Sequence, residues 1–202
     1  MQKTVQPKKP QVNIPRVMDF IDNSNVYQAL KRLNNIDRQW PKAYNPKVIA
    51  ERLAGNRQLI KTFFYCAPPP EYLKNEWDSG KKKYWMQISY YEEIKKLPDL
   101  ELKYAYLTGT KGADLHEKNL DSQLIVDMQR EAIRDNFDTA ILVGCDGDYQ
   151  SVVKELKELG KRIELVYFRD NRSMSLVMWC DVSRRARLSY FEPLPFAYNE
   201  GS

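Results

Sequence analysis

TAILVGCDGDYQSVVKELKELGKRIELVYF, residues 139–168, decides the fold. Its first six residues, 139–144, are apolar and partly β-branched, and they predict a buried strand. A helix is expected from Tyr149 to Leu159, with Gly160 as its stop, and a second strand over residues 162–168. A strand, a helix and a strand in this order form a right-handed parallel crossover. The stretch therefore predicts an α/β protein built on a parallel sheet.

The same alternation of strands and helices extends over most of the chain. Further strands are expected over residues 16–22, 59–67 and 101–107, and further helices over residues 26–40, 45–55, 82–97, 120–135 and 173–181. Because helices between parallel strands cover both faces of the sheet, we expect a three-layer α/β/α sandwich around a mainly parallel five-stranded sheet. In such sheets ligands bind beyond the carboxyl ends of the strands, where the strand order reverses.

The composition fits one domain. The chain has 202 residues, 43% of them hydrophobic, which is enough for a real core. We expect a basic, flexible tail over residues 1–12, the domain over residues 13–192 and a second tail over residues 193–202. Three widely spaced cysteines argue against a disulfide framework, and no apolar run approaches the roughly 18 residues that span a bilayer. The sequence therefore predicts a cytoplasmic protein without a membrane segment.

Acidic residues stand where the predicted strands end. Asp22 closes the first strand, and Asp146 and Asp148 follow the strand over residues 139–144. Asp121 lies at the start of the helix that leads into that strand. If the two strands are neighbours, the four carboxylates converge, and two unit charges about 4 Å apart repel by roughly 4 kcal/mol at an effective dielectric of about 20. Such a group requires a cation or extra protons, and Mg²⁺ prefers oxygen ligands.

Each aspartate also has a structural interpretation. Asp is common after strands because it caps helices and forms turns, and Asp148 is placed to cap the helix expected from Tyr149. For any single aspartate the structural interpretation is preferred. For the four together, at the switch point of the sheet, a metal site is preferred.

These residues resemble the NYN domain family of PIN-like ribonucleases. The family opens with a strand ending in a pattern like F-I-D-x-x-N, matched by residues 20–25, and has K-x-x-D at the start of a helix, matched by residues 118–121. Its strongest stretch resembles D-x-x-x-L-V-S-G-D-x-D-F, matched by residues 138–149, followed by G-x-x-V, matched by residues 160–163. The resemblance spans about residues 14–182, with the patterns in the family's order.

The resemblance implies a PIN-like sheet of order 3-2-1-4-5, Mg²⁺ or Mn²⁺ as cofactor, and RNA as substrate. Carried over position by position, it implies that the catalytic, metal-binding carboxylates are Asp22, Asp121, Asp146 and Asp148. Asn25 would hold the loop or touch the substrate, and Lys118 would contact phosphate. Asp127 lies roughly 240° round the helix from Asp121, so a supporting role is expected as readily as a catalytic one.

Three positions depart from the family pattern. Gly144 stands where the family usually has Ser or Thr, and Cys145 stands where it usually has Gly, so a hydroxyl is missing and a sulfur is added beside the site. Asn23 replaces a common small residue. These changes would reduce activity or shift the metal preference, and they remove no carboxylate. Cys145 as a nucleophile would need His116 as its base, and the spacing does not support that pairing.

Basic clusters accompany the acidic residues. The formal charge is +5, and the clusters are Lys3, Lys8 and Lys9, then Lys81, Lys82 and Lys83, then Arg184, Arg185 and Arg187. Alone, each is best read as solvated surface, but beside a phosphate-handling site Lys81–Lys83 are predicted to bind substrate. The neighbouring aromatics Tyr84, Tyr90 and Tyr91 could stack unpaired bases, whereas Trp85 is expected in the core. Residues 68–85 could then form a flap that grips the substrate.

The sequence therefore predicts a metal-dependent ribonuclease that hydrolyses RNA with metal-activated water, with endonucleolytic cleavage favoured. The alternative is an RNA-binding or scaffold module that kept the fold and lost efficient catalysis, which Gly144 favours. A third hypothesis is a topoisomerase-primase-like site, in which a Glu follows the first strand and a DxD motif follows a later strand. It is disfavoured because the acidic residue here is Asp22, which is an Asp and lies at the end of the first strand itself. The RNA target, the biological pathway and dimerisation stay open.

Overall fold

Six strands form the central sheet of the computed structural model, which describes residues 13–109, 116–169 and 173–191. The strands are β1 (Arg16–Asp22), β2 (Gln58–Cys66), β3 (Leu100–Tyr104), β6 (Thr139–Val143), β7 (Arg162–Tyr167) and β8 (Val182–Arg185). Their order is β3-β2-β1-β6-β7-β8, and every neighbouring pair is parallel. The predicted five-strand order is confirmed, and β8 adds an edge strand that the sequence analysis did not predict.

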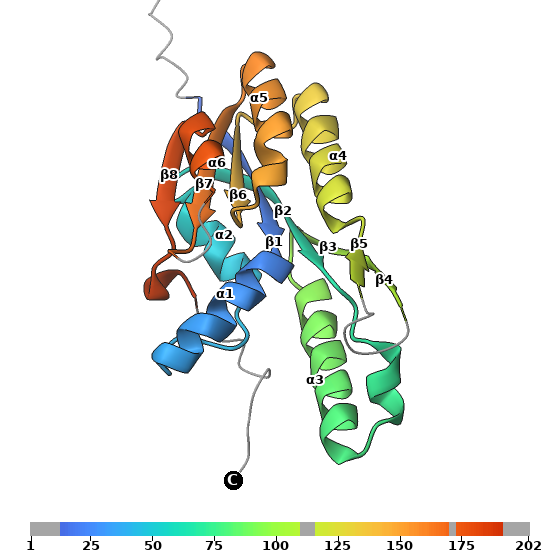
Figure 1. The fold of residues 1–202 in the computed structure, drawn as a ribbon. Coiled ribbons are helices and arrows are strands. Elements are labelled where there is room, and N and C mark those ends of the chain that lie inside the picture. The colour runs from blue at the N-terminus through green and yellow to red at the C-terminus, as the bar shows by residue number, and fades with distance from the viewer. Residues whose placement is uncertain (1–12, 110–115, 170–172, 192–202) are drawn as a thin grey trace, which may run out of the picture.

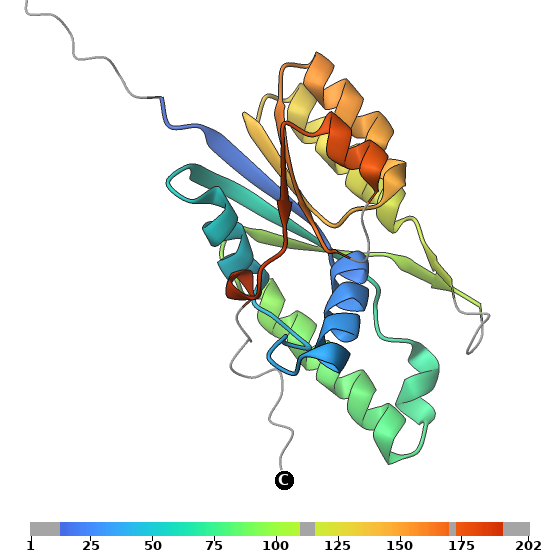
Figure 2. The same ribbon diagram turned by 60° about the vertical axis from the view of Figure 1, so that its left-hand side comes forward.

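Helices cover both faces of this sheet, as expected for parallel strands (Figure 1). One layer contains α1 (Asn23–Ile36), α2 (Pro46–Ala54) and α3 (Asp78–Lys95), and the other contains α4 (Leu120–Ile133), α5 (Gln150–Glu158) and α6 (Met174–Trp179). Figure 2 shows the sheet between the two layers. The described residues also form three 3₁₀ turns, η1 (Glu71–Asn75), η3 (Gly147–Tyr149) and η4 (Leu188–Tyr190). The predicted three-layer sandwich is therefore confirmed.

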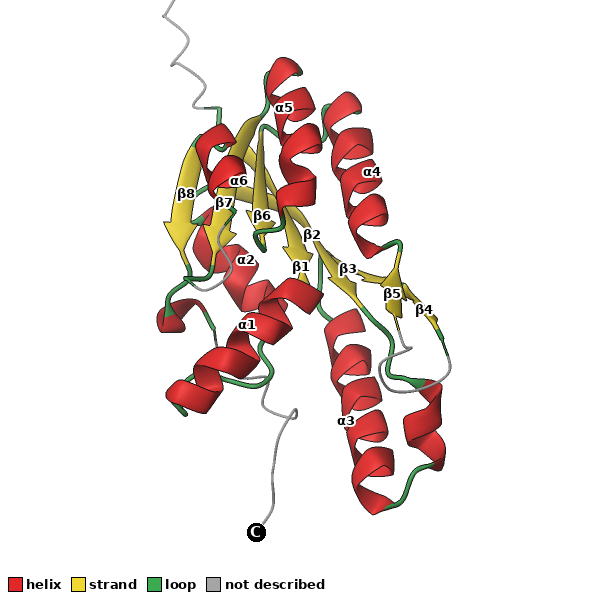
Figure 3. Cartoon of the chain, in the orientation of Figure 1, coloured by secondary structure: helices red, strands yellow, loops and turns green. Residues whose placement is uncertain are grey.

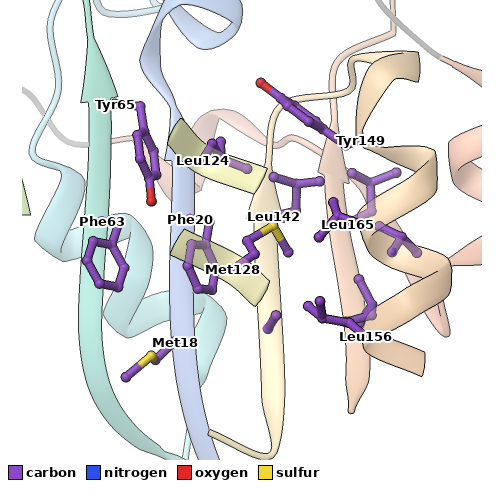
Figure 4. Packing of buried hydrophobic residues seen from close by; sticks show 14 of the residues in the cluster. Met18, Phe20, Phe63, Tyr65, Leu124, Met128, Leu142, Tyr149, Leu156 and Leu165 are labelled. Atoms are coloured by element: carbon purple, nitrogen blue, oxygen red, sulfur yellow. The ribbon is translucent and has the colours of Figure 1, made fainter. Parts of the chain in front are cut away.

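The alternation of side chains along β1 divides the core into two clusters. Val17 and Ile21 are fully buried in the cluster beneath α1 and α2. Met18 and Phe20 belong to the cluster beneath α4 and α5, where the Phe20 and Phe63 rings stack with centroids 5.4 Å apart (Figure 4). Since β1 is buried on both faces, it sits in the middle of the sheet and its carboxyl end lies at the switch point between β2 and β6.

Two helices begin earlier than predicted. α1 begins at Asn23, three residues before the expected start, because the side chain of Asp22 caps it directly at the end of β1. α3 begins at Asp78 and not at Lys82, so the lysines 81–83 lie in its first turns. With η1, α3 forms a helical projection that extends beyond the carboxyl end of the sheet (Figure 3). The predicted flap over residues 68–85 is therefore mostly helical.

The predicted strand over residues 101–107 is wrong in its second half. β3 ends at Tyr104, the partner of Cys66, and residues Tyr106–Thr108 form β4, which pairs antiparallel with β5 (His116–Lys118). The cause is that β2 ends at Cys66, just before Pro68, and prolines lack the N–H that a strand needs to continue its ladder. The chain consequently leaves the sheet and forms a separate hairpin.

Asp19 is fully buried on β1. Within the described part of the chain, neither carboxyl oxygen of Asp19 has a hydrogen-bond partner, nor does the hydroxyl of Thr62, its neighbour on β2. Burial raises the pKa of Asp19 well above its usual value; the positive charges of Arg57 and Lys47 oppose this shift, and the negative charge of Glu164 adds to it. Asp19 is consequently held in its neutral form.

The protonated state of Asp19 predicts a pH-dependent cost to stability. Below about pH 4 the carboxyl is protonated in both the folded and the unfolded chain, so it contributes no pH dependence. Above that pH the unfolded chain loses the proton and the folded protein keeps it, so the free energy of unfolding falls as the pH rises. We expect Asp19→Asn to remove this fall, as measured by urea unfolding between pH 4 and pH 7. A difference between variant and parent that does not change with pH would contradict this.

Several sequence predictions lie outside the described residues. They include the tail over residues 1–12 with Lys3, Lys8 and Lys9, and the tail over residues 193–202. The domain boundaries therefore stay predictions. None of the described helices combines the length and the apolar character that a membrane span requires.

Candidate active site

Asp22 is fixed at the junction between β1 and α1. Its Oδ1 accepts a hydrogen bond of 3.0 Å from the backbone N–H of Asn25, which caps the helix. Its Oδ2 accepts a hydrogen bond of 2.9 Å from the hydroxyl of Tyr149. Only 3% of the residue is exposed. The first predicted carboxylate is thus held rigidly at the switch point of the sheet.

Tyr149 brings Asp121 to the same place. Its hydroxyl oxygen lies 2.5 Å from Oδ1 of Asp121, in the first turn of α4, so both carboxylates contact one phenol oxygen. Figure 4 shows the Tyr149 ring at the border of the core cluster with its oxygen pointing away from Leu165. Burial, and then the negative charges of Asp22 and Asp121, raise the pKa of Tyr149 far above its usual range. The hydroxyl therefore stays protonated and acts as a neutral donor.

A single phenol proton cannot satisfy two carboxylates at once. Asp22 and Asp121 lie within two hydrogen-bond lengths of each other, so their charges repel across a mostly buried space. Carboxylates in such a pair favour a cation or an additional proton. The chemistry of this pair is therefore that of a cation-binding site with oxygen ligands.

The other two predicted carboxylates follow β6. Asp146 is half-buried, and its Oδ1 accepts a hydrogen bond of 3.1 Å from the backbone N–H of Asp148, which caps η3. The prediction that Asp148 caps the following helix is wrong, because α5 begins at Gln150 and its N-cap residue, Tyr149, makes no side-chain capping hydrogen bond. Asp146 lines the same cavity as Asp22 and Asp121, whereas Asp148 is exposed and is not one of the residues lining it.

A large cavity opens over these residues. It has a volume of about 1170 Å³, more than the roughly 300–1,000 Å³ of a small-molecule pocket. α1 forms one wall with Asn25 and Arg32, and α3 forms another with Lys82 and Lys83. Further lining comes from the segment that precedes α3, namely Pro68, Pro70 and Leu73. The predicted flap is thus a wall of the cavity that contains the carboxylates.

Some of the basic side chains near the cavity line it, and others do not. In the part of the chain that the structure describes, Arg32, Lys82 and Lys83 line the cavity without a carboxylate within ion-pair distance. Lys81 does not line the cavity, because it lies on the opposite side of α3 from Lys83 and Met86. Lys118 is exposed on β5 and is likewise not among the lining residues. Of the four lysines predicted to bind substrate, the structure brings two to the cavity.

The aromatic residues of α3 divide between core and surface. Tyr84 and Tyr91 are buried, and the hydroxyl of Tyr90 donates to the backbone carbonyl of Tyr44 over 2.8 Å. Trp85, which was predicted to be in the core, is 50% exposed. The prediction for Trp85 is wrong because Tyr84, one position earlier, occupies the face of α3 that packs toward η1, donating to Glu71.

The departures from the family pattern have structural explanations. Gly144 has φ +129°, and a Cβ there would lie 3.0 Å from Cβ of Asp22. The end of β6 therefore approaches Asp22 closely, and the positive φ and this close contact both favour glycine at position 144. Cys145 is buried, its sulfur accepts from the backbone N–H of Ser173 at 3.2 Å, and it does not line the cavity. Asn23 accepts from the hydroxyl of Tyr44 over 3.0 Å.

The sequence matches the family model of the NYN domain over residues 16–185. This chain belongs to the NYN domain family. The NYN domain is similar in fold to the crystal structure of VPA0982, a protein of unknown function from Vibrio parahaemolyticus, with a TM-score of 0.64 and 14% identity over 91% of this chain and 99% of that one. A search of curated proteins finds no match.

The donor chemistry of this NYN domain fits a hard divalent cation. Asp22 and Asp121 supply two converging carboxylates, and Asp146 lines the same cavity. In the described ranges, no three Asp, Glu, His or Cys side chains come together closely enough to form a metal site by themselves. Mg²⁺ is commonly held by one or two carboxylates, with water and substrate phosphate as the other ligands. Two converging carboxylates meet that requirement.

Asp127 supports the NYN domain away from the cavity. It is 2% exposed, accepts a hydrogen bond of 3.1 Å from the hydroxyl of Tyr65 and forms an ion pair with Arg130. It does not line the cavity. Its position about 1.7 turns beyond Asp121 on α4 therefore fits a supporting role.

Two features of the site were missed in the sequence. Tyr149 replaces the Phe of the family pattern, and its hydroxyl joins the two carboxylates, but a buried aromatic after a strand gives no indication of that contact. Arg32 lies on one stripe of α1 with Asn25 and Gln28, at helical spacings of three and four residues. This polar stripe, which includes Asn25, could have been recognised in the sequence as a possible wall of the site.

Proposed function

We propose that this NYN domain is a metal-dependent ribonuclease that hydrolyses the phosphodiester bonds of RNA. The observation that carries the proposal is the convergence of Asp22 and Asp121 on one phenol oxygen in a cavity whose walls bear cations. Family membership supports it, because NYN domains have the PIN-like nuclease fold. The cavity's size and positive walls suit a polyanion better than a small neutral ligand.

The proposed roles follow from position. Asp22 and Asp121 hold Mg²⁺ or Mn²⁺, and Asp146 adds a third carboxylate from the adjoining wall of the cavity. Asp148 acts from outside the cavity, by orienting the turn that Asp146 caps. When bound, the cation supplies a hydroxide nucleophile at neutral pH and offsets charge on the phosphate. Tyr149 keeps the first two carboxylates aligned. Asn25 fixes the end of β6 by accepting from the backbone N–H of Cys145 at 3.4 Å.

Metal binding and cleavage test the proposal together. At about 100 times its dissociation constant, Mn²⁺ should stabilise the protein by about 2.7 kcal/mol, which raises the melting temperature by about 5–10 °C. Asp146→Asn should reduce this shift and abolish cleavage of a mixed RNA pool. Asp127→Asn serves as the control, because it lowers the starting stability and leaves the Mn²⁺ shift and cleavage in place. Cleavage by Asp146→Asn at the parent rate would refute the assignment.

An RNA-binding module without efficient catalysis is the second candidate. It is favoured by the finding that, among the described residues, no ready-made set of three metal-binding side chains is present. The same experiment separates the two functions. Binding of Mn²⁺ and RNA without turnover would support the module, and Mn²⁺-dependent turnover would support the nuclease.

The two faces of α3 predict different effects of charge reversal. Lys82→Glu and Lys83→Glu should each weaken binding of single-stranded RNA about fivefold and lower its salt-dependence slope by about 0.7, because each removes one phosphate contact from the cavity wall. Lys81→Glu carries the same charge change on the opposite side of the helix and should leave both quantities nearly unchanged. Fluorescence anisotropy at several salt concentrations measures them. Equal effects at all three positions would show that α3 acts only through its overall charge.

A further inference from the structure

A second, smaller hollow lies along α1 next to the large cavity. Its volume is about 270 Å³, and its lining residues are Tyr27, Lys31, Asn34, Asn35, Arg38 and Lys42. Tyr27 and Lys42 also line the large cavity. The two hollows therefore adjoin, and we refer to the smaller one as the α1 groove.

α1 presents neighbouring stripes to the two hollows. Asn25 and Arg32 face the large cavity, whereas Tyr27, Lys31 and Asn34 follow one another at helical spacing along the groove. The stripe begins in the second turn after Asp22 and continues past the end of the helix at Ile36. The groove thus leads away from the carboxylates toward the far end of α1.

The charge of the groove is positive. Lys31 and Arg38 are exposed, and in the described ranges neither has a carboxylate within ion-pair distance. Nη1 of Arg38 instead donates to the neutral amide oxygen of Asn34 over 3.2 Å, which positions the guanidinium without neutralising it. By contrast, Arg57 and Lys95, on other faces of the molecule, are paired with Glu164 and Glu92. The groove is therefore suited to bind an anionic ligand.

An aromatic side chain stands where the groove meets the cavity. Tyr27 is 45% exposed and lines both hollows. An exposed ring between two hollows whose walls bear cations provides a flat surface for stacking, in addition to phosphate contacts on either side. Aromatic rings interleaved with cations are typical of surfaces that bind single-stranded nucleic acid.

We propose that the α1 groove is a second binding site for the same RNA strand, holding its backbone on Lys31 and Arg38 after a base has stacked on Tyr27. This inference rests on the proposed function, because the RNA enters the groove from the cavity. It predicts that RNA long enough to occupy both hollows binds and is cut better than RNA that fills the cavity alone. The preferred substrate is accordingly an unpaired strand that extends beyond the scissile phosphate.

The test compares two lengths of fluorescein-labelled oligouridine, of about 4 and about 16 nucleotides, by anisotropy with the full chain in EDTA. The double variant Lys31→Glu/Arg38→Glu should weaken binding of the longer RNA about tenfold and change that of the shorter RNA less than about twofold. Tyr27→Ala should weaken binding of the longer RNA by about tenfold and that of the shorter RNA less, whereas Tyr27→Phe should keep the affinity for both because the ring remains.

The matched control is Lys96→Glu/Arg134→Glu. Lys96 and Arg134 are the C-cap residues of α3 and α4, which precede β3 and β6, so they lie at the edge of the sheet opposite the carboxylates. Both are exposed, and the control changes the net charge by the same amount. The groove inference is overturned if the groove variant and the control bind the longer RNA equally. It is also overturned if the parent protein binds the longer RNA no more tightly than the shorter one. Absence of Mn²⁺-dependent cleavage by the parent refutes the proposed function instead, and the comparison in EDTA still decides the groove.

Discussion

Replacing Asp22 with Asn is expected to lower RNA cleavage by about three orders of magnitude or more, because it removes one of two converging ligands of the cation that activates water. The protein should nevertheless fold. Asn caps helices as well as Asp does, so its amide oxygen can still accept from the backbone N–H of Asn25. Its amide group then faces the Tyr149 hydroxyl in place of Oδ2.

The control for this variant is Asp127→Asn. Both residues are buried carboxylates that accept a hydrogen bond from a tyrosine hydroxyl, but only Asp22 lines the cavity. Asp127→Asn should be destabilised by about 1–3 kcal/mol, since it weakens the buried contact with Arg130, and should cut RNA at nearly the parent rate. Single-turnover cleavage and urea unfolding of both variants separate chemistry from stability. Equal losses of cleavage in the two variants would show that the effect of Asp22 is structural.

Gly144→Ser, which restores the residue usual in the family, is expected to impair this protein. The backbone has φ +129° at this position, and the new Cβ would meet Cβ of Asp22 at 3.0 Å. Backbone strain of about 1–3 kcal/mol adds to crowding of a similar size, so we expect a total loss of about 2–4 kcal/mol of stability. Because the clash displaces Asp22 itself, cleavage should fall as well. Thermal unfolding and the RNA assay measure both effects.

Gly160→Ser provides the comparison for Gly144→Ser. Gly160 also has a positive φ, +75°, but a Cβ there would have nothing within 4 Å. Its replacement should therefore cost only the backbone strain, about 1 kcal/mol, and leave cleavage unchanged. A Gly144→Ser variant that is as stable as Gly160→Ser and cuts RNA faster than the parent would mean that the missing hydroxyl limits catalysis.

The sequence predicted the central strands well and the edges of the sheet poorly. Residues 17–21 and 140–143 are mostly apolar because both faces of β1 and β6 are covered, and such runs are easily recognised. β8, with the sequence VSRR, has one apolar residue and two arginines, so its composition resembles that of a solvent-exposed segment. Its place in the sheet comes from pairing with β7, which a local pattern does not contain.

The candidate site was predictable in outline because it lies at the ends of these central strands. Strand ends identified Asp22 and Asp146, because carboxyl ends of neighbouring parallel strands meet at one edge. The convergence of Asp22 and Asp121 on the hydroxyl of Tyr149 depends on how α4 packs on the sheet, and this packing is a tertiary property. For Lys81–Lys83, the division between cavity and solvent depends on where α3 begins, which differs from the predicted start by four residues.

Asp22 divides its two oxygens between two different tasks. Oδ1 holds the first turn of α1, and Oδ2 faces the hydroxyl shared with Asp121. A ligand bound at Oδ2 therefore contacts the residue that caps α1, the helix that carries Tyr27 and Lys31. The proposed cation site and the α1 groove are thus connected through Asp22 and the first turn of α1.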